Sequence, residues 1–136
     1  MKYYYAIVHK DPGSAYGAEF PNLPGCFSAA DDMESLLANA VTAVELWMED
    51  AESVPEARDV EAIREVAGDA LADGAFLLAV PYIRRGGRPV RANISLDRGM
   101  LDAIDKAAAA LNLTRSAFLA EAARNEIEGR HLASQA

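Results

Sequence analysis

The sequence has little of what secreted and membrane proteins require. Cys26 is the single cysteine in 136 residues, which excludes an internal disulfide framework and fits a reducing cytosol. The longest apolar run, residues 75–80, is far shorter than the roughly 20 residues that a membrane-spanning helix needs. The N-terminus has one lysine and a short apolar run before charge, a pattern that predicts no signal peptide. We therefore expect a cytoplasmic protein.

Residues for metal or catalytic chemistry are also scarce. The two histidines, His9 and His131, are isolated in the sequence, whereas a metal site needs three or four clustered ligands. A two-metal nuclease needs carboxylates that converge on both ions, and the candidates Asp11 and Glu19 form no such cluster. We expect no catalytic residues, no metal site, no cofactor and no enzyme activity.

Basic residues are rare in the first part of the chain and common in the second. Residues 1–81 contain four basic and fifteen acidic residues, a net charge of −11. Residues 82–136 contain nine basic and six acidic residues, a net charge of +3. Such a division indicates two parts with different partners. The acidic part suits a basic protein, and the basic part suits the phosphates of a nucleic acid.

The first part has the pattern of an α+β domain. Aromatic, β-branched and alternating residues predict strands over 2–10, 15–20, 26–30 and 75–83. Helical spacing of apolar residues predicts a long helix from Met33 to about Ala51, with Asp31 or Asp32 as its N-cap. A shorter helix is predicted within residues 58–74. The order β-β-β-α-(α)-β favours one sheet with the long helix packed on one face.

A second domain follows the arginine- and glycine-rich stretch 84–89, which reads as a linker. Residues 90–96 alternate between polar and apolar residues, as a strand does. Asp97 is placed to cap a first helix, Asn112 to end it in a left-handed turn, and Thr114 to cap a second helix. The predicted boundaries are 1–83, 84–89 and 90–130.

A β-α-α unit of about 45 residues cannot bury a core alone, so we expect a homodimer in which two copies of strand 90–96 pair. Ile94 and Leu96 would then cover the helices. The opposite face would carry the base-reading side chains of a ribbon in the DNA major groove, namely Arg91, Asn93 and Ser95. Thr114, Arg115 and Ser116 would offer free backbone N–H groups to a DNA phosphate. The alternative is a purely structural dimer with a solvated polar face.

Residues 89–128, with "RANISLD" and "LTRSAF", resemble the ribbon-helix-helix family. The stretch "FPNLPGCFSAADDMESLLANA" and the closing "ADGAFLLAVPYI" resemble the HicB antitoxin family. The combined resemblance spans nearly the whole chain. It implies a partial RNase H-like domain over residues 1–83 that binds and blocks a HicA-like mRNA-cleaving toxin. It also implies a ribbon-helix-helix domain over residues 90–130 that represses the shared operon by binding operator DNA.

Candidate toxin-binding residues lie at the acidic end of the long helix and on the first strand. The candidates are Tyr4, Glu45, Glu49, Asp50 and Glu52. The simplest interpretation of the four acidic residues is that water solvates them at the end of the helix. Tyr4 is either a core residue or an aromatic anchor for the toxin. Two other functions remain open. One alternative is a stand-alone regulator in which residues 1–81 sense a small ligand. The other is an interaction module whose dimer multiplies the number of binding sites.

Overall fold

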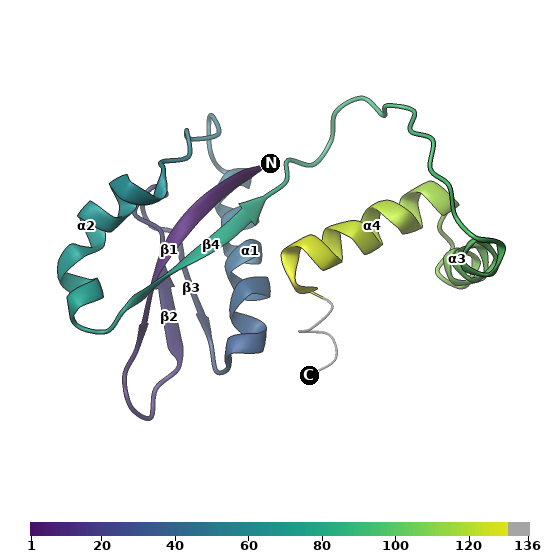
Figure 1. The fold of residues 1–136 in the computed structure, drawn as a ribbon. Coiled ribbons are helices and arrows are strands. Elements are labelled where there is room, and N and C mark those ends of the chain that lie inside the picture. Colours follow the sequence, from purple (N-terminus) through teal and green to yellow (C-terminus); the bar gives the residue numbers. More distant parts are fainter. Residues whose placement is uncertain (131–136) are drawn as a thin grey trace. The chain divides into compact units, whose positions relative to one another are not determined.

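The structure is a computed structural model that describes residues 1–130, and Figure 1 shows its elements in chain order. The described chain divides into a first unit, Met1–Arg84 together with residues 128–130, and a second unit, Arg85–Ile127. The division lies within the predicted linker. His131 lies outside the described residues.

Four antiparallel strands form the sheet of the first unit. They are β1 (Lys2–Lys10), β2 (Tyr16–Glu19), β3 (Phe27–Ala30) and β4 (Phe76–Tyr82), in the order β3-β2-β1-β4. Val8 pairs with Ala18 of β2 and also with Phe76 of β4, so β1 is a central strand. The four predicted strands of this part are confirmed, with ends that differ by one residue at most.

The main core lies between the sheet and helix α1 (Met33–Glu49). Successive side chains of a strand point to opposite faces, so Tyr4, Ala6 and Val8 share one face of β1. They are buried together with Leu36 and Val44 of α1 in one hydrophobic cluster. The helical spacing of the apolar residues in α1 therefore placed this helix correctly against the sheet.

Helix α2 (Val60–Ala72) flanks the sheet on the side away from α1, as Figure 1 shows. Ile7 of β1 points to this second face and is buried, as are Ile63 and Ala67 of α2. The sequence placed the long helix on one face of the sheet, and α2 adds a second helix on the other face, which the sequence did not assign. The periodicity of α2 is too short and too interrupted by Gly68 and Asp69 to show which face it covers.

Polar side chains fix the ends of α1. Asp32 is the N-cap, and its carboxylate accepts a hydrogen bond from the N–H of Ser35 at 2.8 Å. The neighbouring Asp31 does not take that place. Near the other end, the indole N–H of Trp47 donates to the carbonyl of Pro24 at 2.9 Å, which ties the helix to the loop before β3.

The second unit contains helix α3 (Arg98–Ala110) and all of helix α4 (Arg115–Glu128) except its last residue. Asp97 caps α3 by accepting from the N–H of Met100 at 2.8 Å, and Thr114 accepts from the N–H of Ala117 at 3.1 Å. Asn112 adopts a left-handed conformation with φ of 57°. These three predictions are confirmed. Residues 90–96 form no strand in the single chain. The predicted strand needs a second copy as its partner, so it stays a prediction.

Candidate functional site

The C-terminal end of α1 carries the acidic candidates. Glu49 and Asp50 are exposed, as is Glu52 just beyond the helix, whereas Glu45 is half-buried. The last turn of α1 contains no basic residue. Carboxylates at a helix C-terminus meet the negative end of the helix dipole, so this surface favours a cation. The structure therefore brings all four acidic candidates to one end of one helix.

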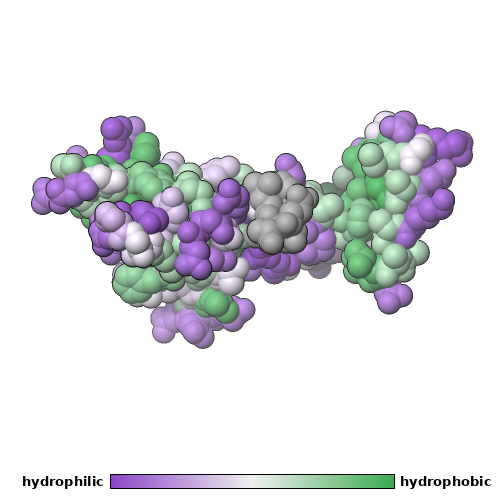
Figure 2. All heavy atoms as spheres, turned by 90° about the horizontal axis from the view of Figure 1, so that it is seen from below, coloured by the Kyte–Doolittle hydropathy of each residue, from purple (hydrophilic) through white to green (hydrophobic). Residues whose placement is uncertain are grey.

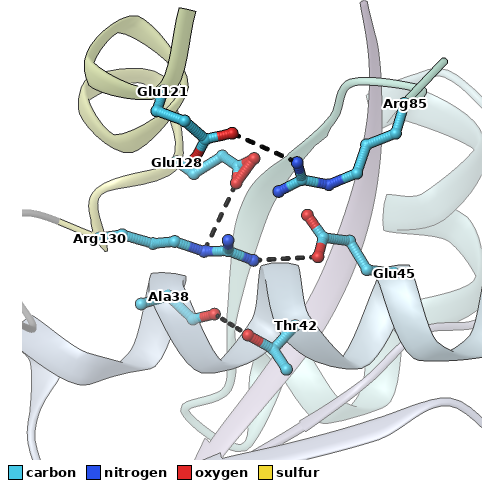
Figure 3. A network of polar contacts seen from close by, with 7 residues as sticks. All are labelled: Ala38, Thr42, Glu45, Arg85, Glu121, Glu128 and Arg130. Carbon is cyan, nitrogen blue, oxygen red and sulfur yellow. Dashed lines mark hydrogen bonds and ion pairs between the residues drawn. The ribbon is translucent and has the colours of Figure 1, made fainter. Parts of the chain in front are cut away.

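Glu45 already has a cationic partner within the first unit. A guanidinium nitrogen of Arg130 lies 3.1 Å from Oε2 of Glu45, and Nε of the same arginine lies 3.5 Å from Oε2 of Glu128 (Figure 3). The side chains of Arg130 and Glu45 are each only about a quarter exposed, at 27% and 25%. Water screens such a pair less than it screens a pair on an open surface.

Tyr4, the remaining toxin-binding candidate, is not on the surface. It is 1% exposed, its ring packs edge-on against Tyr82, and its hydroxyl donates a hydrogen bond to the carbonyl of Pro55. Burial raises the pKa of its hydroxyl, and the neighbouring Tyr82 adds to the shift. The interpretation of Tyr4 as an exposed anchor is wrong, because its face of β1 is the one that α1 covers. Tyr3, on the other face, is exposed.

The candidate DNA-reading segment is open to solvent in the single chain. Arg91, Asn93 and Ser95 are all exposed. The alternating apolar residues are exposed as well, with Val90 at 87% and Ile94 at 64%. Both faces of this segment are exposed to solvent, so its apolar side packs against nothing in its own chain.

The rest of the second unit also lacks a core. Only Ile104 and Ala108 are buried hydrophobic residues there, among the described positions. Large apolar side chains remain exposed, and Figure 2 shows hydrophobic residues gathered on the surface around α3, beside a hydrophilic edge. Besides Val90 and Ile94, the exposed large apolar residues of this unit are Leu96, Met100, Leu111, Leu113 and Ile127. Isolated exposed apolar residues are ordinary, but a unit that exposes most of its large ones marks an interaction surface.

The three candidate phosphate contacts, Thr114, Arg115 and Ser116, lie at the start of α4, and the side chain of Arg115 is already paired with Asp105. The guanidinium of Arg115 holds the carboxylate of Asp105 through two hydrogen bonds of 2.9 Å. These hydrogen bonds lower the pKa of Asp105 and raise the pKa of Arg115. Thr114 and Ser116 are exposed. The backbone N–H groups of Arg115 and Ser116 lie in the first turn, where a helix has no internal acceptor for them.

Other chemistry is sparse in the part of the chain that the structure describes. Cys26 is a free, buried thiol, and burial raises its pKa to about 11. Residues 1–130 contain no group of three or more potential metal ligands. They also contain no helix long and apolar enough to cross a membrane.

Comparison with known proteins decides the family. A family model described as "HicB_like antitoxin of bacterial toxin-antitoxin system" matches residues 4–123. The chain belongs to this HicB-like antitoxin family. The chain is similar to the crystal structure of the Burkholderia pseudomallei antitoxin HicB, with 33% sequence identity and a TM-score of 0.51. The match covers 90% of this chain and 96% of that chain. The chain is 27% identical to the crystal structure of antitoxin HicB3, with 92% and 97% covered and a TM-score of 0.50. No curated protein sequence matches it.

Some residues of this HicB-like antitoxin were beyond sequence reasoning. Arg130 and its partner Glu45 are 85 positions apart, and no local pattern links them. Asp105 of α3 was not among the residues that the sequence singled out, although it holds Arg115. Its ten-residue separation from Arg115 across a helix–turn–helix connection was the one available signal. The acidic end of α1, in contrast, followed directly from the charge count.

Proposed function

We propose that this antitoxin neutralises a HicA-like, basic, mRNA-cleaving toxin through its first unit. The observation that carries the proposal is the negative surface at the end of α1. Glu49, Asp50 and Glu52 are exposed there, without any basic residue in the last turn of the helix. Complementary charge speeds encounter with a basic partner and fixes its orientation. Family membership supplies the class of partner.

A set of three substitutions tests the toxin-binding surface. We expect Glu49→Gln, Asp50→Asn and Glu52→Gln together to weaken toxin binding by about tenfold, since exposed charge pairs contribute roughly 0.2–1 kcal/mol each. The control neutralises three exposed carboxylates on α2 and so removes the same amount of negative charge; they are Glu61, Glu65 and Asp69. Equal loss of affinity in both variants would show that net charge alone matters and that α1 is not the surface.

We propose further that the second unit forms a ribbon-helix-helix homodimer that binds operator DNA and represses its own operon. Support comes from the exposed apolar side chains of this unit, which a second copy would cover. The exposed Arg91, Asn93 and Ser95 would then form a two-fold set in the major groove. The free N–H groups at the start of α4 would contact phosphate, while Arg115 positions α3 through Asp105.

The order of β1, β2 and β3 followed by α1 supports a related proposal, that the first unit is a partial RNase H-like domain. The domain boundaries 1–83 and 90–130 belong to the same proposal. They need one adjustment, since residues 128–130 group with the first unit.

Two experiments separate this function from its alternatives. Growth of cells that express the neighbouring toxin should be restored when this chain is co-expressed. Gel shifts with DNA from upstream of its gene should show a complex that salt weakens steeply, because binding to phosphates releases counterions. Operator binding without any rescue of growth would favour a stand-alone regulator. Rescue without operator binding would favour an interaction module.

A further inference from the structure

The last residues of α4 and those just after it pack against α1 in a specific way. Glu128, Gly129 and Arg130, here called the C-terminal strap, group with the first unit. Glu128 is 1% exposed, and Gly129 is also buried. Three consecutive residues with this burial at the end of a helix form a docked segment rather than a frayed end.

Two features favour glycine at position 129. Its φ of +71° lies in the left-handed region that side chains disfavour. A Cβ placed there would also lie 3.0 Å from Cδ2 of Leu37 on α1. A side chain at position 129 would therefore adopt a strained backbone conformation and displace the end of the Leu37 side chain slightly.

Arg130 completes the docking with charge. Its guanidinium contacts Glu45 on α1 and Glu128 in the strap itself, as Figure 3 shows. Glu45 lies one helical turn before Glu49, the first of the three exposed carboxylates that the proposed function assigns to the toxin. The chain thus places one of its own arginines beside the surface where the proposed function requires basic side chains of the toxin.

We propose that the C-terminal strap is an internal competitor for the toxin-binding surface of α1. Arg130 holds Glu45 until a basic side chain of the toxin replaces it, and the strap then leaves α1. The inference rests on the proposed function, because it takes the toxin as the competing ligand. It assigns Glu45 a direct contact with the toxin and Arg130 a role that opposes binding.

The size of the effect follows from competition within one chain. A tethered competitor lowers apparent affinity by the fraction of molecules in which the surface is free. The partly buried ion pair of Arg130, with the fitted glycine beside it, is expected to keep the strap docked in about four of five molecules. Removal of the competitor should therefore strengthen toxin binding by roughly fivefold.

Three single substitutions in the full-length chain test the proposal, with binding to the HicA-like toxin measured by calorimetry. Arg130→Gln removes the guanidinium, and Gly129→Ala loosens the strap without any change of charge. Both should strengthen binding by roughly fivefold. Arg88→Gln, an exposed arginine of the second unit, removes the same charge and should leave the affinity unchanged. Glu45→Gln also frees the surface from the strap, but it removes the toxin contact of Glu45, so its affinity should stay below that of Arg130→Gln.

The outcomes are distinct. If wild type and all variants fail to bind the toxin, the proposed function itself is wrong. If wild type binds and Arg130→Gln and Gly129→Ala match it while circular dichroism shows an intact fold, the strap is not a competitor and the inference is overturned. If Arg88→Gln strengthens binding as much as Arg130→Gln, net charge explains the gain and the inference is likewise overturned.

Discussion

The exposed apolar residues of the second unit lead to a quantitative prediction for dimerisation. Ile94→Ala removes three carbon groups, each worth about 0.8 kcal/mol when buried. Ile94 is 64% exposed in the single chain, so most of this gain becomes available only when a second copy covers it. Ile94→Ala should therefore weaken the free energy of dimerisation by about 1.5 kcal/mol per chain and about 3 kcal/mol per dimer. This corresponds to roughly a hundredfold increase in the Kd of the dimer.

Sedimentation of the full-length protein over a wide concentration range measures that constant. Arg91→Ala is the matched control, since Arg91 lies on the polar side of the same segment and should change the Kd by less than about threefold. A Kd for Ile94→Ala within threefold of wild type would refute the reasoning. A large effect of Arg91→Ala with none from Ile94→Ala would mean that the two faces are assigned the wrong way round.

The other predictions concern recognition, packing, pH and the thiol. Asn93→Ala should weaken operator binding by about 1–3 kcal/mol in a gel shift, and an unchanged constant would remove this side chain as a base reader. Ile63→Ala should lower the free energy of unfolding in urea by about 2–4 kcal/mol, because Ile63 is fully buried, and a loss below about 0.5 kcal/mol would mean that α2 is not packed on the sheet. The hydrogen bonds from Arg115 hold the pKa of Asp105 in the folded chain below its unfolded value of about 3.9. The stability that this ion pair contributes is therefore present above about pH 4 and is lost as pH falls through the folded pKa. Asp105→Asn should therefore flatten the fall of Tm between about pH 4 and pH 2, and an unchanged slope would contradict the coupling to Arg115. Cys26 should resist iodoacetamide at pH 8 in the native chain and react in urea, since its buried thiol has a pKa of about 11; fast native alkylation would contradict its burial.

Local chemistry made much of the fold predictable from the sequence. Asp97 and Thr114 cap helices because short polar side chains reach the free N–H groups of the first turn, a rule that needs no knowledge of the rest of the chain. Asn112 takes the left-handed conformation for an equally local reason. The strands followed from residue type and alternation, and the ends of each lie close to the turn residues that bound it.

Contacts between distant residues were not predictable in the same way. Alternation places Tyr4 on the face opposite Tyr3, but it does not say which face α1 covers. The answer depends on how the helix returns over the sheet, and there the prediction failed for Tyr4. The pairing of Arg130 with Glu45 depends on the path of the whole chain, which no pattern in residues 120–130 records.

The candidate surfaces divide along the same line. The acidic end of α1 and the alternating residues 90–96 could be located from charge and periodicity alone. Their present partners could not. The sequence showed neither that Arg115 is held by Asp105 nor that Glu45 is held by Arg130.

The most direct test of the account is inhibition of RNA cleavage by the HicA-like toxin that the proposed function names as the partner. Purified full-length chain is titrated into the reaction, and the remaining cleavage rate is measured against the ratio of the two proteins. The account predicts a linear fall to zero at one chain per toxin. Cleavage that continues at the uninhibited rate in a tenfold excess of folded chain would contradict it.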